Sequence, residues 1–280
     1  MPGRPHAGPP GVHYSSSKQM KKIVLFGALL IAAGLSSCSK DDAGGSSTAT
    51  GKASVSFHLT DAPGAYDAVN VDIRQVVVIT DQGETTLTPV KAGVYNLLEF
   101  SNGLDVLLCQ SDLPAGHISQ MRLVLGSNNS VVVDGKSYPL NTPSAQQSGL
   151  KFNFHQELKA DASYHVWIDF DAGKSVVKTG KDSYNLKPTI RAYTELTNGK
   201  IKGVVLPLLA QPVVFAIKGS DTLSAIPASD GHFVFSGLAE GNYSLWYNVA
   251  AGSGFSATVK TNVAVSFGTI TDVGTVTLLP

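Results

Sequence analysis

Residues 164–170 read Tyr-His-Val-Trp-Ile-Asp-Phe, and large apolar side chains recur there at every second position. Successive side chains of a β-strand point to opposite faces of a sheet, so this period predicts a strand with one buried face. The same alternation recurs at residues 55–59, 69–73, 213–217, 233–235 and 243–247. Beyond residue 52 the sequence has no sustained period of 3.6 residues, the period that indicates amphipathic helices. The chain is therefore predicted to be all-β.

Turn sequences separate these candidate strands, as at Asp81-Gln82-Gly83 and Gly180-Lys181-Asp182. Many short strands joined by such turns are typical of sandwiches and barrels. The alternation restarts after Thr197-Asn198-Gly199, which indicates a domain boundary. We predict two tandem β-sandwich domains, at residues 52–195 and 198–280. A short helix is expected around Gly103–Gln110.

The first 37 residues have the features of an export leader. Met20-Lys21-Lys22 is followed by an apolar run at Ile23–Leu35 and then by Ser36-Ser37-Cys38. The run is 13 residues long, whereas a membrane-spanning helix needs roughly 20. We therefore expect a cleaved signal peptide in residues 1–37. Residues 1–19 are interpreted as an upstream extension, with Met20 as the true start.

Leu35-Ser36-Ser37-Cys38 resembles a bacterial lipobox, in which the cysteine becomes the lipidated N-terminus of the mature protein. The next residues, Ser39-Lys40-Asp41-Asp42, resemble the Lys-acidic-acidic export signal of surface lipoproteins in Bacteroidetes-like bacteria. The resemblance implies an outer-membrane lipoprotein that is anchored through acylated Cys38 and exposed at the cell surface. Residues 38–51 are rich in Gly, Ser and Thr and are expected to form a flexible tether. The alternative is an ordinary secreted protein in which Cys38 is incidental.

Charge and cysteine content narrow the choice of partners. Four of the 21 basic residues and none of the 21 acidic residues precede Cys38, so the mature chain has a net charge near −4. A mildly acidic chain without a basic stripe argues against nucleic acid as the partner. If Cys38 is acylated, Cys109 has no disulfide partner, because the chain has two cysteines. We expect Cys109 to be a small buried apolar side chain without reactive character.

The segments Leu59-Thr60-Asp61-Ala62-Pro63 and Tyr66-Asp67-Ala68-Val69 resemble the opening of a bacterial family called domain of unknown function 4382. Further motifs follow in the same order at residues 113–116, 121–123, 148–151, 169–171 and 186–188. The resemblance covers about residues 52–195. It implies a location and a fold class more than an activity.

The C-terminal part resembles another group of sandwiches. Gly231-His232-Phe233-Val234-Phe235-Ser236-Gly237-Leu238 and Glu240-Gly241-Asn242-Tyr243-Ser244-Leu245 are similar to carboxypeptidase regulatory-like, transthyretin-type domains. In that pattern the Gly-x-Phe hairpin and the Gly-x-Tyr turn belong to the scaffold. The resemblance implies a spacer, a stabiliser or a glycan-binding accessory.

Acidic residues near the ends of candidate strands are the main candidates for a cation site. Ca²⁺ takes six to eight oxygen ligands, and Asp61, Asp67, Asp169 and Asp171 are its candidate ligands here. Structural roles are the favoured interpretation, because Asp residues commonly hydrogen-bond their own turns. Asp169 and Asp171 share one strand face and are expected to be solvated. Either Arg122 or Arg191 is expected to pair with one of these acids, and for both arginines a structural ion pair is favoured over recognition of a ligand.

Motifs of familiar enzymes are incomplete in this chain. Ala172-Gly173-Lys174-Ser175 lacks the earlier glycine of a phosphate-binding loop, and Phe154-His155-Gln156-Glu157 lacks the second histidine of a zinc protease. The sequence has no Gly-x-Ser-x-Gly elbow. We therefore expect a protein that is not an enzyme and has no cofactor apart from Ca²⁺, if any.

Two tryptophans are the best candidates for stacking on a sugar. Trp167 and Trp246 lie within alternating stretches, and packing in a core or between domains is the favoured interpretation of both. The sequence thus favours a surface lipoprotein acting as an accessory, structural or ligand-binding module, with an envelope protein as a possible partner. The alternatives are a glycan-binding protein that uses these aromatic side chains and a hydrolase with an unfamiliar site.

Overall fold

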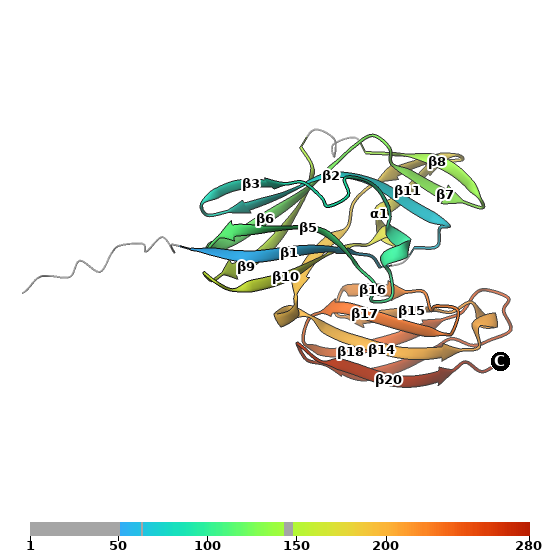
Figure 1. Ribbon diagram of the computed structural model, residues 1–280. Helices are drawn as coiled ribbons and strands as arrows, with labels where there is room; N and C mark the ends of the chain where they lie inside the picture. Colours follow the sequence, from blue (N-terminus) through green and yellow to red (C-terminus); the bar gives the residue numbers. More distant parts are fainter. Residues whose placement is uncertain (1–50, 63, 143–147) are drawn as a thin grey trace, which may run out of the picture. The chain divides into compact units, whose positions relative to one another are not determined.

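The structure is a computed structural model that describes residues 51–62, 64–142 and 148–280 (Figure 1). The leader, Cys38 and the rest of the expected tether before Gly51 lie outside the described residues. Within the described ranges the chain is almost entirely strands and turns, with one short α-helix, α1 (Ala172–Ser175). No described helix has the length and apolar character needed to cross a membrane. The prediction of an all-β chain with tandem sandwiches is confirmed.

A four-stranded sheet and a nine-stranded sheet form the first sandwich. The four-stranded sheet has the order β13-β10-β1-β5, and its β1 and β10 are parallel. Its strands are β1 (Lys52–Thr60), β5 (Val106–Pro114), β10 (Ser163–Phe170) and β13 (Ile190–Thr194).

The nine-stranded sheet has the order β11-β12-β8-β7-β2-β6-β9, and β3 and β4 also pair with β2. Its strands are β2 (Ala68–Thr80), β3 (Gly83–Leu87), β4 (Gly93–Asn96), β6 (Gly116–Leu125), β7 (Ser130–Val133), β8 (Lys136–Asn141), β9 (Leu150–Leu158), β11 (Val176–Gly180) and β12 (Ser183–Leu186). A 3-10 helix, η1 (Leu97–Phe100), follows β4.

The apolar side chains of the four-stranded sheet bury against the nine-stranded sheet as the alternation predicts. Phe57 of β1 and Ile168 and Phe170 of β10 are completely buried and belong to one hydrophobic cluster with residues from both sheets. Burying one such side chain contributes roughly 1.5–3 kcal/mol. This cluster therefore fixes which face of β1 and β10 points inward and which is left for other contacts.

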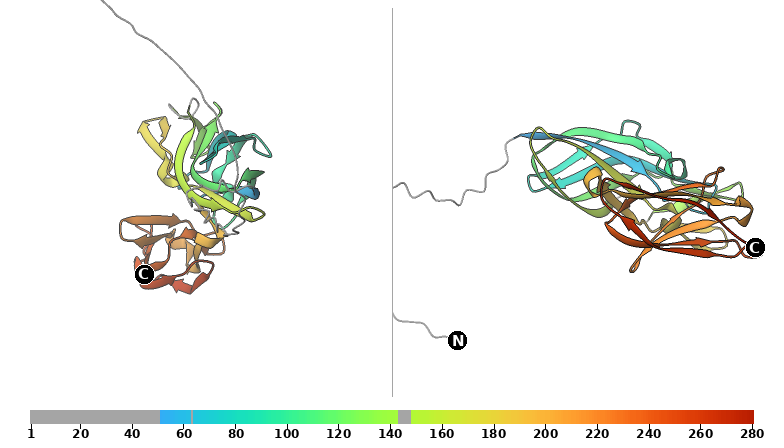
Figure 2. Two further views of the ribbon diagram at one scale, coloured as in Figure 1. Left: turned by 90° about the vertical axis from the view of Figure 1, so that its left-hand side faces the viewer. Right: turned by 90° about the horizontal axis from the view of Figure 1, so that it is seen from below.

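Two smaller sheets form the second sandwich, coloured orange to red in Figure 1 and Figure 2. Their orders are β17-β14-β20 and β16-β15-β18-β19. The strands are β14 (Gly199–Leu206), β15 (Val213–Lys218), β16 (Asp221–Ala225), β17 (His232–Leu238), β18 (Gly241–Asn248), β19 (Thr258–Val265) and β20 (Ile270–Thr277). Two 3-10 helices, η2 (Glu195–Thr197) and η3 (Leu208–Ala210), precede and follow β14. A second hydrophobic cluster, which includes Phe233 and Tyr247, holds this sandwich together.

The helix expected around Gly103–Gln110 is wrong, because β5 begins at Val106. A register shift between Phe57 and His58 of β1 interrupts the pairing with β5. Such a bulge lets two consecutive residues of a strand share one face, and Leu108 and Cys109 are both buried. The expected burial of Cys109 is confirmed, and burial raises the pKa of its thiol to about 12.

Candidate functional site

The side chains of the four-stranded sheet that point away from the core form three rows across its strands. The first row joins Gln110, Ser56 and His165. The second row joins Leu107, His58, Trp167 and Tyr193, and the third joins Thr60, Asp169 and Arg191. We call this set of rows the outer face.

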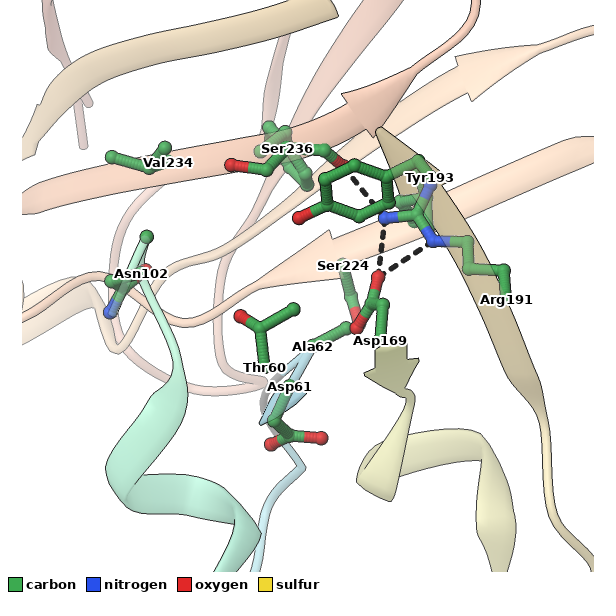
Figure 3. Close-up of a pocket in the computed structure, with 13 residues that line it drawn as sticks. Thr60, Asp61, Ala62, Asn102, Asp169, Arg191, Tyr193, Ser224, Val234 and Ser236 are labelled. Carbon is green, nitrogen blue, oxygen red and sulfur yellow. Dashed lines mark hydrogen bonds and ion pairs between the residues drawn. The ribbon is translucent and has the colours of Figure 1, made fainter. Parts of the chain in front are cut away.

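In the third row, Asp169 of β10 forms an ion pair with Arg191 of β13 (Figure 3). Arg191 Nε lies 2.6 Å from Asp169 Oδ2, and Nη2 lies 2.5 Å from the same oxygen. The guanidinium also donates to the carbonyl oxygens of Gly237 and Ser236 in β17, at 2.9 and 2.8 Å. The planar fork of arginine suits such multiple contacts. Arg191 thus connects the first sandwich to a strand of the second, and the predicted ion pair is confirmed.

This ion pair borders a cavity of about 20 Å³, lined by residues of both sandwiches that include Thr60, Asn102 and Ser236 (Figure 3). Asn102 adds a further connection, because its Nδ2 donates to Ile226 O at 3.1 Å. The volume corresponds to about one water molecule, which is too small for an organic substrate. The buried pair therefore connects the two sandwiches beside a cavity that has no room for an organic ligand.

Asp61 lines the same cavity but has a different partner. Its Oδ1 accepts a hydrogen bond from Ala172 N at 2.9 Å, and Figure 3 shows the carboxylate pointing away from the pair of Asp169 and Arg191. Loss of solvation on burial raises the pKa of Asp61 well above its ordinary value, and the charges of Asp169 and Asp171 raise it further. The bond from Ala172 acts in the opposite direction. Because the pKa of Asp61 is raised in the folded chain, its protonation makes the stability of the fold depend on pH.

The other two candidate cation ligands have local partners. Asp171 Oδ1 accepts from Lys174 N at 2.9 Å and caps α1, and its Oδ2 lies 3.2 Å from Lys174 Nζ. Asp67 Oδ2 accepts from Gly135 N at 2.8 Å, at the turn between β7 and β8. In the described part of the chain, no three His, Cys, Asp or Glu side chains are grouped so that they could hold a metal ion. The Ca²⁺ site at Asp61, Asp67, Asp169 and Asp171 stays a hypothesis.

The expectation that Asp169 and Asp171 are solvated is wrong, because their exposed fractions are 4% and 5%. Strand alternation places Asp169 on the outer face, but β17 of the second sandwich covers this end of the face through Arg191. Asp171 follows the end of β10 and turns inward as the N-cap of α1. Both burials depend on contacts that a strand pattern does not contain.

Trp167, in the second row, is held by three neighbours. Its Nε1 donates to Asp105 Oδ2 at 3.0 Å, and its ring stacks on Tyr193 with a centroid distance of 5.7 Å and an interplanar angle of 13°. The ring of His58 lies 5.7 Å away on the neighbouring strand. His58 Nδ1 is in turn 2.7 Å from Asp105 Oδ1. One carboxylate therefore orients both aromatic rings.

Two hollows are found at or near Trp167. The sheet groove, of about 310 Å³, is lined by side chains that include Ser54, Ser56, His58, Leu107, Gln110 and His165. Trp167 itself lines a second hollow of about 440 Å³ with the exposed side chains of Leu196 and Ile270. The rings of His58 and His165 lie 5.7 and 6.3 Å from that of Trp167. Two residues that line the groove therefore lie next to the indole.

Sequence reasoning singled out Trp167 but missed His58, His165 and Asp105. In the sequence, His58 is separated from Trp167 by more than 100 residues, and the parallel pairing of β1 with β10 brings them together. Asp105 comes from the segment just before β5. The signal in the sequence was the series of polar side chains that alternate with apolar ones at residues 54–60. This series indicates a binding surface only when the pairing of β1 with β10 is known.

Trp246 lies on β18 in the second sandwich, with 40% of its surface exposed. Its ring centroid is 5.5 Å from that of Phe215 on β15, and its partner on β19 is the exposed Val259. Packing in a core, one of the two interpretations favoured from the sequence, is therefore wrong for Trp246. Trp246 and Trp167 are both found on sheet faces that point away from the cores.

Residues 52–188 match the family model described as Domain of unknown function (DUF4382). The family description assigns no activity. None of the curated proteins compared with the chain matches it.

Solved structures of two pilins and of a Bacillus anthracis protein share a distant likeness with the chain. The Bacillus anthracis TIE protein is 12% identical with a TM-score of 0.23, and the match covers 82% of this chain and 34% of that protein. This chain thus spans about a third of the length of that protein. GBS52, the minor pilin of Streptococcus agalactiae, is 12% identical with a TM-score of 0.22 and coverages of 82% and 97%. The shaft pilin SpaA of Lactobacillus rhamnosus GG is 9% identical with a TM-score of 0.22 and coverages of 82% and 98%. Likeness at this level says nothing about function.

Proposed function

We propose that the chain is a surface lipoprotein of a bacterial outer membrane and acts as a non-enzymatic accessory or structural module. The observation that carries the structural role is the connection between the sandwiches, in which Arg191 bonds Asp169 on one side and two carbonyl oxygens of β17 on the other. Lys174 Nζ adds a bond to Thr222 O, and Asn102 adds one to Ile226 O. Such side-chain bridges between domains suit a module that presents a fixed surface.

The sequence around Cys38 supports the anchor. Its basic start, short apolar run and small residues before the cysteine are the features of a processed lipoprotein signal. One acyl chain binds a bilayer only marginally and two or more hold it firmly, at about 0.8 kcal/mol per buried CH₂. The C-terminal sandwich, with its resemblance to carboxypeptidase regulatory-like domains, acts in this proposal as a stabilising accessory.

The non-enzymatic assignment is supported by the environment of the perturbed acid. Asp61 has a raised pKa, but it borders a cavity of about 20 Å³ and accepts a backbone hydrogen bond. A general acid must reach the atom that it protonates. Asp61 is too enclosed for that role.

The anchor is tested by expressing the full chain and its Cys38→Ser variant in a bacterium with an outer membrane, with radiolabelled palmitate in the medium. We expect label and membrane association in the wild type and neither in the variant. Globomycin, which blocks lipoprotein signal peptidase, should make the wild-type precursor accumulate. Protease added to intact cells should then degrade the mature chain. Unlabelled, fully soluble wild-type protein would contradict the anchor.

A second candidate function, glycan binding, is favoured by the outer face of the first sandwich. Trp167 is half-buried, is fixed by Asp105 and Tyr193, and lines a hollow of about 440 Å³. Carbohydrate sites commonly pair an aromatic platform with hydrogen-bonding side chains. The test is an oligosaccharide array probed with the full chain, with and without Ca²⁺. Absence of binding under both conditions would remove this candidate and leave the structural role standing.

A further inference from the structure

We infer that the outer face of the four-stranded sheet binds a neutral carbohydrate, with Trp167 as the stacking platform and the sheet groove as the hydrogen-bonding part of the site. The inference rests on the second candidate function, glycan binding, and assigns it a place and a ligand class. The groove holds about 310 Å³, at the lower end of the roughly 300–1,000 Å³ of small-molecule sites. Trp167 does not line the groove, but the rings of His58 and His165, which do, lie 5.7 and 6.3 Å from its ring. A short oligosaccharide lying across β1 and β10 would reach from the groove to the indole.

The first argument is the preorganisation of the aromatic rings. A pyranose ring has apolar C–H faces, which pack on a flat aromatic side chain, and hydroxyl groups around its edge. Trp167 is held by its bond to Asp105 and by the stacked ring of Tyr193, so binding would freeze little further motion. His58 is fixed by the same carboxylate. Asp105 is thus a positioning residue for two rings.

The second argument is the chemistry of the groove lining. Sugar hydroxyls donate and accept hydrogen bonds, and hydroxyl, amide and neutral imidazole groups do the same. Ser54, Ser56, Gln110 and His165 provide these groups, with Ser56 Oγ hydrogen-bonded to His165 Nδ1 at 2.9 Å. Among the described residues that line the groove there is no Lys, Arg, Asp or Glu. The hollow that Trp167 lines includes one acidic and one basic residue, Glu195 and Lys200, whose formal charges balance. These two compositions favour a neutral ligand over a uronic acid, a sulfated glycan or a phosphate.

The third argument comes from the other exposed tryptophan. The cross-strand neighbours of Trp246 are Phe215 and Val259, both apolar, so hydrogen-bonding groups for a sugar are missing directly beside it on those strands. The two tryptophans therefore differ in their surroundings although both belong to outer sheet faces. Trp246 is the matched control for Trp167.

The experiment uses the full chain in lauryldimethylamine oxide, a detergent without a sugar head group. Neutral gluco-, manno-, galacto- and xylo-oligosaccharides are screened on an array, and the best binder is measured by calorimetry. Trp167→Ala should weaken binding about tenfold or more, as expected for an aromatic hot spot. Trp246→Ala should change affinity by less than about twofold, because that indole lies outside the site.

Two further variants keep the test decisive if Trp167→Ala fails to fold. Gln110 and His165 are exposed, so Gln110→Ala and His165→Ala should keep the fold, which a cooperative thermal unfolding transition and an unchanged circular dichroism spectrum would show. Each should weaken the same ligand by about threefold to tenfold, the usual value of one hydrogen bond. Weaker binding with an intact fold would show that these side chains contact the ligand, because loss of a purely structural residue would affect the fold as well.

The outcomes separate this inference from the function on which it rests. Loss of binding in Trp246→Ala with retention in Trp167→Ala overturns the site and leaves glycan binding standing. Unchanged affinity in both Gln110→Ala and His165→Ala also overturns the site. Binding of anionic sugars alone overturns the ligand class. Failure of the wild type to bind any sugar removes both the inference and the glycan-binding function.

Discussion

Replacing Arg191 with alanine should destabilise the folded chain by about 3 kcal/mol. The substitution removes both contacts to Asp169 Oδ2 and the two hydrogen bonds to carbonyl oxygens of β17. Removing one partner of a buried ion pair costs about 3–5 kcal/mol, because the remaining charge is buried without compensation. The Asp169 side chain is 5% exposed but that of Arg191 is 34% exposed. Solvent therefore screens part of the interaction, and the lower end of that range applies.

The two partners should respond unequally. In Asp169→Asn the arginine keeps its bonds to Ser236 O and Gly237 O and its access to solvent, so we expect a loss of only about 1 kcal/mol. In Arg191→Ala a buried carboxylate is left unpaired. The double variant should therefore be more stable than Arg191→Ala alone, since its second substitution removes the uncompensated charge. This sign reversal is specific to the charge-burial argument.

The assay is urea unfolding followed by tryptophan fluorescence and far-ultraviolet circular dichroism. The chain has two tryptophans, and they lie in different sandwiches. Fluorescence in a Trp246→Phe background therefore reports the first sandwich, and a Trp167→Phe background reports the second. The reasoning is refuted if Arg191→Ala loses less than about 1 kcal/mol, or if adding Asp169→Asn to it lowers stability further.

Three other outcomes follow from the described contacts. Gly237→Ala should destabilise the fold by about 1–3 kcal/mol more than Gly252→Ala. Both glycines have positive φ (+66° and +78°), but only at Gly237 would an added Cβ clash with the Tyr193 ring, at 2.3 Å. Equal losses of stability in urea unfolding would contradict this clash. Burial raises the folded-state pKa of Asp61 above its ordinary value of 3.8, so the folded chain binds the proton of this carboxyl group more tightly than the unfolded chain. The resulting stabilisation is complete below about pH 3.8 and is lost as pH rises from there through the folded-state pKa. Stability measured from about pH 4 to pH 7 should thus fall less steeply in Asp61→Asn, and an unchanged slope would refute the assignment. Burial raises the pKa of Cys109 to about 12, so iodoacetamide at about pH 8 should alkylate it only in urea; labelling of the folded chain, detected by peptide mass spectrometry, would show that the thiol is accessible.

The inward face of each strand was predictable from the sequence, because burial of alternate apolar residues is a local property. Val166, Ile168 and Phe170 are all buried, as the alternation requires. The bulge opposite Phe57 was not predictable, since it depends on how β1 pairs with β5. The bulge places Leu108 and Cys109 on the same side of β5. The resulting apolar run at residues 106–109 is compatible with a helix as well as with a strand.

The outer face was much less predictable, because its partners come from distant parts of the chain. Ser56 and His165 are 109 residues apart and meet through the parallel pairing of β1 and β10. The sequence suggested an acidic partner for Arg191 but gave no means to choose Asp169. Strand alternation also assigned Asp169 to solvent, and the second sandwich removes it from solvent. The alternation of apolar residues along a strand indicates neither which strands pair nor which domains are in contact.

The second sandwich affects the outer face beyond covering its third row. Tyr193 contacts residues of both domains. The indole of Trp167 stacks on its ring, and the backbone of Gly237 lies so close that an added Cβ would clash with the same ring. Arg191, which bonds the carbonyl oxygen of the same Gly237, also lies 5.8 Å from the Tyr193 ring centroid. The position of Tyr193 thus depends on β17, and the position of Trp167 depends on Tyr193. A domain that contributes no side chain to the sheet groove therefore helps to set the orientation of the aromatic ring beside it, which gives the tandem arrangement a role in recognition as well as in stability.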